Sequence, residues 1–205
     1  MKLPIVFVYF LLSFSQLNAQ EGKVDSLQKI LKSDLSDIDR VNTLLQLSAV
    51  TLKDQIELSD ESVEKAFSLS KKNNYQEGVA KSKYRKALIL FEQKNVTNAI
   101  NEATESIEIY RLLGDSLRKD QSIVHYWLGR AYYNAARYEQ SISELTEVYN
   151  IRKSYNDTSS MIKAVNWLAN AYEKLGNLDE SVIKANEGYE LSMASNDLGT
   201  AAVSI

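Results

Sequence analysis

The chain has 205 residues, 44% of them hydrophobic, with a formal net charge of −3 and a mean hydropathy of −0.30, values typical of a folded domain with a sizeable core. Because it contains no cysteine, disulfides, thiolate zinc sites and cysteine nucleophiles are excluded, and its acidic balance disfavours nucleic acid as a partner. Proline occurs once, at Pro4, and glycine seven times, so the breakers that punctuate all-β folds are scarce and helix is expected throughout.

The first nineteen residues predict a secretory signal peptide. Lys2 supplies a positive start, residues 3–15 are almost wholly apolar, and Ala19 ends a cleavage site. The apolar stretch is shorter than the ~20 residues that a membrane-spanning helix needs. We therefore expect cleavage after Ala19 and a secreted or periplasmic protein whose mature chain, starting at Gln20, has no membrane span.

The next segments are expected to be a capping helix followed by two helix pairs. Residues 20–39 carry Leu27, Ile30 and Leu31 at helical spacing, which predicts a helix that covers the end of a stack. Residues 40–74 are interpreted as a first helix pair and residues 75–115 as a second.

The first helix of the second pair carries a cluster of four basic residues, Lys81, Lys83, Arg85 and Lys86. Lys83 and Lys86 stand at packing positions, so either their aliphatic stems cover the interface while the ammonium groups reach water, or the helix packs loosely. The cluster is interpreted as a solvated face rather than a nucleic-acid site.

A 40-residue echo defines the following pairs. Residues 128–132, Leu-Gly-Arg-Ala-Tyr, recur as residues 168–172, Leu-Ala-Asn-Ala-Tyr. The echo predicts helix pairs over residues 116–157 and 158–197, with small residues at Gly129 and Ala169 where neighbouring helices come close. Residues 198–205 are interpreted as the start of a further repeat, cut before its second helix.

This pattern resembles the tetratricopeptide repeat (TPR) family in a variant longer than the usual ~34 residues. Its family positions include His125, Leu128, Gly129, Tyr132 and Ser141 in one copy. The resemblance covers roughly residues 40 to 195. It implies an all-α fold, a right-handed superhelical stack of antiparallel helix pairs (a TPR-like solenoid), and a scaffold that binds a protein or peptide.

In TPR arrays the first helices line a concave groove, and the resemblance therefore implies the binding residues. They are Tyr84, Leu88, Phe91, Tyr126, Arg130, Tyr133, Asn134, Asn166, Asn170 and Lys174. Tyrosine and arginine combine a large contact area with a hydrogen-bonding tip, and asparagine can hold a peptide backbone. The alternative is that this concave face is solvated and unused.

Catalytic and cofactor patterns are not found in the sequence. His125 is the one histidine, which excludes a multi-histidine metal site, and it is interpreted as a packing residue. Glycine-rich phosphate loops are absent. The carboxylate pairs Asp60-Glu61 and Asp179-Glu180 are interpreted as stabilising the starts of second helices. We therefore expect no enzymatic activity, no metal and no cofactor.

Two functions are considered. The first is an exported scaffold that binds a protein or peptide on its concave face. The alternative is the N-terminal extracytoplasmic sensor region of a longer signalling protein, for example a histidine kinase or a transcriptional regulator, with its signalling module beyond Ile205. A hydrolase is disfavoured because the nucleophile and metal patterns are missing.

Overall fold

The computed structural model describes residues 20–195, and the expectations for residues 1–19 and 198–205 lie outside this range. The chain divides into two compact units, Met1–Glu102 and Ala103–Ile205. The first contains a helix over residues 20–31, α2 (Asp37–Thr51), α3 (Ile56–Lys72), α4 (Gln76–Glu92) and the beginning of α5 (Val96–Leu113). The second contains the end of α5, the short η1 (Asp115–Leu117), α6 (Arg118–Asn134), α7 (Tyr138–Ser154), α8 (Thr158–Leu175) and α9 (Leu178–Ala194).

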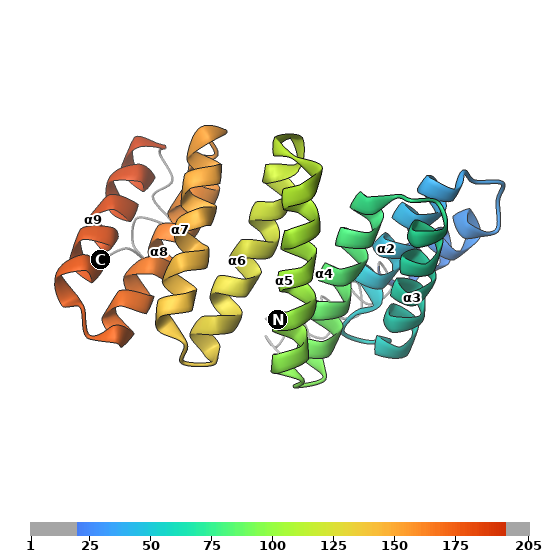
Figure 1. The fold of residues 1–205 in the computed structure, drawn as a ribbon, viewed down its shortest axis with the longest axis horizontal. Coiled ribbons are helices and arrows are strands. Elements are labelled where there is room, and N and C mark those ends of the chain that lie inside the picture. Colours follow the sequence, from blue (N-terminus) through green and yellow to red (C-terminus); the bar gives the residue numbers. More distant parts are fainter. Residues whose placement is uncertain (1–19, 196–205) are drawn as a thin grey trace, which may run out of the picture. The chain divides into compact units, whose positions relative to one another are not determined.

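Within each unit, helices that follow one another in the chain pack against one another. In the first unit α3 lies against both α2 and α4, and in the second unit α6, α7, α8 and α9 form an antiparallel row (Figure 1). No strand occurs between residues 20 and 195, so the predicted all-α fold is confirmed. None of the helices in this range combines the length and apolar character needed to cross a membrane.

Five of the described helices end in the same kind of turn, built on one residue in the left-handed conformation. These residues have φ values between 54° and 83° and are Asn74, Lys94, Ala136, Asn156 and Gly176. The following residue donates its N–H to a carbonyl five residues earlier, as Arg137 does to Tyr132 (2.9 Å) and Asn177 does to Tyr172 (2.9 Å). Arg137 and Asn177 are also the N-caps of α7 and α9. One helix therefore ends and the next begins within three residues.

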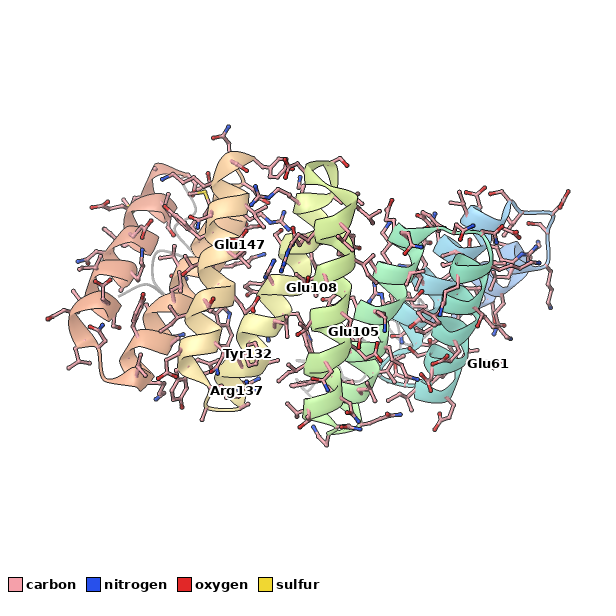
Figure 2. All side chains as sticks on the ribbon, viewed as in Figure 1. Glu61, Glu105, Glu108, Tyr132, Arg137 and Glu147 are labelled. Atoms are coloured by element: carbon pink, nitrogen blue, oxygen red, sulfur yellow. The ribbon has the colours of Figure 1, made fainter. Side chains whose placement is uncertain are left out.

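Helices α6 and α8, which both end in such a turn, have the same burial pattern. The residues 121–131 and 161–171 show the same succession of buried, half-buried and exposed positions, 40 residues apart. Tyr132 and Tyr172 are both half-buried next to their turns. At the first turn, the guanidinium of Arg137 lies 4.7 Å from the centre of the Tyr132 ring, where α6 meets α7 (Figure 2).

The close packing of α6 against α7 at Gly129 depends on the absence of a side chain there. A Cβ atom built on Gly129 would lie 2.6 Å from Cγ of Leu145, a side chain with no exposed surface. The expectation that helices meet closely at Gly129 is therefore confirmed. Forty residues later the corresponding positions hold Ala169 and Ala185. Alanine thus replaces the smaller glycine on one helix and the larger leucine on the other.

The basic cluster of α4 is not a solvated face. Lys86 donates to Asp60 (2.6 Å) and Glu64 (2.8 Å) of α3, and Lys83 donates to Glu102 (3.0 Å) of α5. Burial alone would lower the pKa of Lys86, but the two carboxylates outweigh it and raise that pKa. The interpretation of these lysines is thus corrected, because acidic residues on neighbouring helices neutralise them.

The interpretation of Asp60 also changes. Helix α3 begins at Ile56, so Asp60 lies beyond the first turn and serves as an ion-pair partner rather than as a helix-end charge. Asp179 and Glu180 do lie in the first turn of α9, where negative charge is favourable.

We predict that replacing Ala136 with glycine stabilises the protein. Alanine at φ 56° bears a steric cost that glycine avoids, so the free energy of unfolding should rise by about 0.5–1 kcal/mol. Chemical denaturation measures this change. The matched control is Ala135→Gly, at φ −87°, which should lower stability. Equal effects of the two changes would contradict the proposed role of the left-handed turn.

We also predict that Gly129→Ala and Leu145→Ala are coupled. Alone, the first overfills the α6–α7 contact and costs about 1–3 kcal/mol, while the second opens a cavity and costs about 2–5 kcal/mol. The double variant reproduces the alanine pair found 40 residues later and should lose at least about 1 kcal/mol less than the two single losses combined. Strict additivity in a double-mutant cycle would show that the two sites do not share one contact.

Candidate functional site

Trp167 of α8 is the centre of an aromatic and cationic cluster in the second unit. Its indole Nε1–H donates to the hydroxyl of Tyr126 on α6 (3.0 Å). The Tyr133 ring meets it edge to face, with ring centroids 5.2 Å apart, and Tyr133 also meets Tyr138 at 5.6 Å. We name Tyr126, Arg130, Tyr133 and Trp167 the Trp167 cluster.

Arg130 lies on the aromatic part of this cluster. Its guanidinium carbon is 5.2 Å from the Trp167 ring centroid and 5.7 Å from that of Tyr126. The side chain is exposed, and between residues 20 and 195 it forms no ion pair with a carboxylate. Two rings therefore hold a cation whose charge is not neutralised locally, an arrangement suited to receiving an anionic or carbonyl oxygen from a ligand.

The other predicted binding residues lie on three helices. Asn134, exposed, is one turn after Arg130 on α6, and Asn170 and Lys174 are exposed on α8, where Asn166 is half-buried. The structure thus brings Tyr126, Arg130 and Tyr133 together and places exposed amide and ammonium groups on the same two helices. The remaining three residues are half-buried on α4 of the first unit: Tyr84, Leu88 and Phe91.

The sequence reasoning missed Trp167, the residue that joins α6 to α8, and Tyr138. A signal for Trp167 was present. It stands 40 residues after Trp127, at the corresponding position of the next repeat, and both are half-buried in the structure. Its contacts to Tyr126 and Arg130 depend on the packing of two different repeats, which the pattern within one repeat does not reveal.

A buried arginine fixes the helices that carry the cluster. Arg152, at the end of α7, donates from Nη1 to Asp157 (2.9 Å) and from Nη2 to the Lys119 carbonyl at the start of α6 (3.2 Å). Asp157 is the N-cap of α8 and accepts from the backbone N–H of Ser160 (3.2 Å) and from its hydroxyl (2.9 Å). Burial by itself would raise the pKa of Asp157, but the Ser160 hydrogen bonds and the Arg152 charge outweigh it and hold this pKa below its usual value.

A second polar cluster joins α7 to α9. A hydrogen bond to Glu187, helped by burial, raises the pKa of Tyr149 to about 12. Lys184 donates to the same carboxylate (2.9 Å), and its ammonium lies 5.7 Å from the centre of the Tyr149 ring. Glu187 accepts hydrogen bonds from both Tyr149 and Lys184, so the polar groups of this cluster are already paired. The cluster therefore holds α9 against α7 and offers little to a ligand.

His125 is buried between α6 and α7, and its Nδ1 lies 2.6 Å from Oε2 of Glu144. His125 therefore pairs with the carboxylate of Glu144 inside the α6–α7 interface. In the part of the chain that the structure describes, no group of three histidine, aspartate or glutamate side chains could hold a metal ion.

Comparison with known proteins supports the fold. No family description and no curated protein matches the sequence. Among solved structures, a signal transduction ATPase with a tetratricopeptide repeat sensor from Pyrococcus horikoshii is similar over 94% of this chain, with a TM-score of 0.76 and 17% identity. This chain spans only 30% of that protein.

Two further structures show the same likeness. A Podospora anserina kinesin light chain with TPR-like repeats is similar over 90% of this chain and 92% of its own, with a TM-score of 0.69 and 16% identity. A Rap protein in complex with Competence and Sporulation Factor is similar over 89% of this chain and 52% of its own, with a TM-score of 0.73 and 16% identity. The fold is therefore that of TPR-like solenoid proteins, as predicted.

We predict that Asp157→Asn removes an acid-sensitive part of the stability. Asparagine keeps a capping oxygen but loses the charge that faces Arg152, so the free energy of unfolding should fall by about 2 kcal/mol at pH 7. Since the folded pKa of Asp157 is lowered, its contribution is complete above the unfolded value of ~3.9 and is lost as pH falls through the folded pKa.

Denaturation of both proteins between pH 7 and pH 2 measures the effect, and their stabilities should converge at the acid end. The control is Asp179→Asn at an exposed position in the first turn of α9, expected to cost less than about 1 kcal/mol. A loss for Asp157→Asn that does not vary with pH would contradict the ion-pair account.

Proposed function

We propose that this chain binds a segment of another protein on the surface formed by α6 and α8, and that it performs no chemistry of its own. The observation that carries the proposal is Arg130, an exposed cation held on two aromatic rings without a carboxylate partner among residues 20–195. Arginine and aromatic side chains with restricted freedom are the usual energetic centres of protein interfaces.

The neighbouring groups favour a polypeptide ligand. Asn134 and Asn170 are exposed amides that both donate and accept, which suits the alternating N–H and C=O groups of a peptide backbone. Lys174 adds a second cation on α8. The similar Rap structure was solved with Competence and Sporulation Factor bound, which supports a binding role for this fold.

Site-specific photo-crosslinking tests the proposal. A photoreactive benzoyl-phenylalanine replaces Asn170 on α8 or, as the matched control, the exposed Asn150 on α7. The source cells are irradiated, and the crosslinked protein is identified by mass spectrometry. We expect a discrete adduct from position 170 and none from position 150. Equal adducts from both positions, or none from position 170, would contradict the assignment of this surface.

The partner found in this way then allows a quantitative prediction. With the purified partner, Arg130→Ala should weaken binding at least about tenfold, because it removes the central cation of the surface. The control, Arg111→Ala, removes an exposed arginine from α5 and should leave the affinity unchanged. An unchanged dissociation constant for Arg130→Ala would overturn the proposed role of the Trp167 cluster.

A second candidate is the sensor region of a longer signalling protein. One face of α9 leaves Leu178, Val182, Tyr189 and Met193 exposed, whereas α7, its equivalent 40 residues earlier, is covered by α8. The face is suited to a further helix of the stack, and the similar Pyrococcus horikoshii protein carries its tetratricopeptide repeats as a sensor. Sequencing the transcript beyond the Ile205 codon tests this candidate: further repeats and a signalling module would support it, and an immediate stop codon would exclude it.

Export is part of both candidates. The apolar residues 3–15 and the small residue Ala19 support it. Mass spectrometry of the protein recovered from outside the cytoplasm should find Gln20 as the first residue, and recovery of the chain with Met1 from the cytoplasm alone would contradict export.

A further inference from the structure

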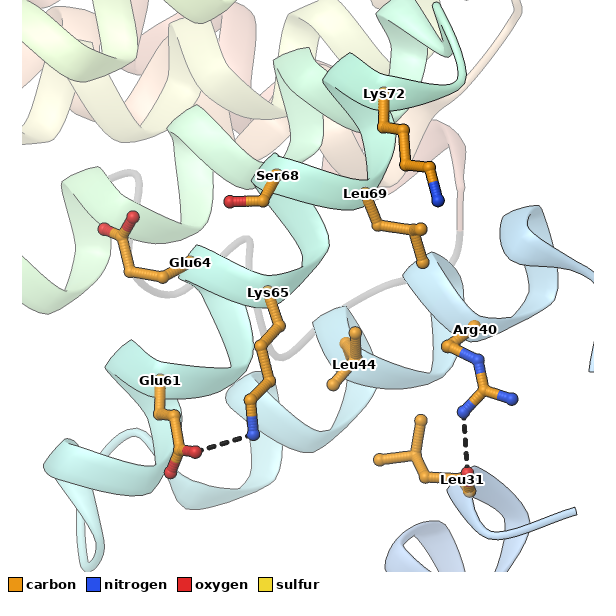
Figure 3. Close-up of a pocket in the computed structure, with 9 residues that line it drawn as sticks. All are labelled: Leu31, Arg40, Leu44, Glu61, Glu64, Lys65, Ser68, Leu69 and Lys72. Atoms are coloured by element: carbon orange, nitrogen blue, oxygen red, sulfur yellow. Dashed lines mark hydrogen bonds and ion pairs between the residues drawn. The ribbon is translucent and has the colours of Figure 1, made fainter.

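The first unit contains an open groove that is separate from the Trp167 cluster. It has a volume of about 670 Å³ and lies between the end of the 20–31 helix, α2 and α3 (Figure 3). Its lining along α3 runs from Glu61 to Lys72, which at 1.5 Å per residue spans about 16 Å. The rim residues Glu61, Lys65, Ser68 and Lys72 are exposed, so a ligand in this groove would remain in contact with solvent on one side.

The floor of the groove is apolar. Leu44 is 7% exposed and belongs to a core cluster with Val41, and Leu31 and Leu69 pack on that cluster from the neighbouring helices. Because these side chains are part of the folded core, the floor exists before any ligand arrives. A preformed apolar surface favours binding, since little ordering has to accompany it.

Among the residues that the structure describes, the acidic side chains around the floor have ion-pair partners and two of the basic side chains do not. Glu61 accepts from Lys65 (2.6 Å), and Glu64 accepts from Lys86 of α4 (2.8 Å), so both acids have cationic partners. At the other end of the groove lie Lys72, the last residue of α3, and Arg40 on α2 (Figure 3).

These two cations have no carboxylate partner in the described part of the chain. Arg40 donates to the carbonyls of Leu31 (2.7 Å) and Ser33 (3.4 Å), and Lys72 forms no ion pair there. One end of an apolar groove therefore carries two positive charges that a ligand could neutralise.

We propose that this groove binds a short segment of a partner protein in which apolar side chains are followed by carboxylates. The apolar side chains lie over Leu31, Leu44 and Leu69, and the carboxylates lie over Arg40 and Lys72. A peptide is favoured over a small molecule because small-molecule sites bury most of the ligand surface, whereas this groove is open along its length. The site lies in the first unit and does not depend on the proposed function of the Trp167 cluster.

A random twelve-residue peptide library displayed on phage, selected against the full 205-residue chain, provides the probe. The best peptide is synthesised, and its binding is measured by fluorescence anisotropy. Ser68→Trp fills the groove from an exposed position on α3, and Lys72→Gln removes one of the two cations. The matched control Lys71→Gln makes the same charge change in the same turn of α3, at an exposed lysine outside the groove lining. Ser143→Trp adds the same bulk at an exposed position on α7.

We expect selected peptides to share apolar residues next to Asp or Glu. Their affinity should fall at least about tenfold for Ser68→Trp and about fivefold for Lys72→Gln, with less than about twofold change for Lys71→Gln, Ser143→Trp and Arg130→Ala. Unchanged helical circular dichroism and an unchanged unfolding midpoint show that each variant is folded.

Three results would overturn the proposal. These are no enrichment of peptides, a basic or uncharged consensus, and binding that is indifferent to both groove variants. Peptides that lose affinity in Arg130→Ala alone would support the proposed function while contradicting the groove.

Discussion

The left-handed turn is the constraint on which the rest of the structure depends. A residue with positive φ after a helix sends the chain back within three residues, and its neighbour closes one helix while capping the next. Between Ala136 and Gly176 these residues are spaced by twenty, so α7 (17 residues) and α8 (18 residues) have nearly the same length, and the burial pattern of α6 recurs in α8. The spacing of the turns, and not only the hydrophobic pattern, therefore sets the register of one helix against the next.

The Trp167 cluster follows from that register. Tyr126 and Arg130 are four residues apart and share one face of α6, and Trp167 presents its ring to both from the next repeat. A shift of α8 by one residue would rotate this ring by about 100° around the helix and separate the three groups. Arg152 resists such a shift, because it joins the ends of α6, α7 and α8 through Lys119 and Asp157.

Much of the fold could be predicted from the sequence, because helical periodicity and the 40-residue echo are local signals. The echo also predicted the close helix contact at Gly129, because the small residue recurs at Ala169. The roles of Lys83 and Lys86 could not be predicted, since their partners Glu102, Asp60 and Glu64 lie on other helices. Trp167 was missed because its importance arises between repeats, and the groove over Leu44 was missed because three separate segments form it.

The central claim, that Arg130 lies on the ring of Trp167 from the next repeat, can be tested most directly by nuclear magnetic resonance. With the guanidinium carbon 5.2 Å from the ring centroid, the methylene protons of Arg130 should show upfield ring-current shifts and nuclear Overhauser effects to the Trp167 indole, and the indole N–H should exchange slowly with water. Random-coil shifts for Arg130 together with fast indole exchange would contradict the account.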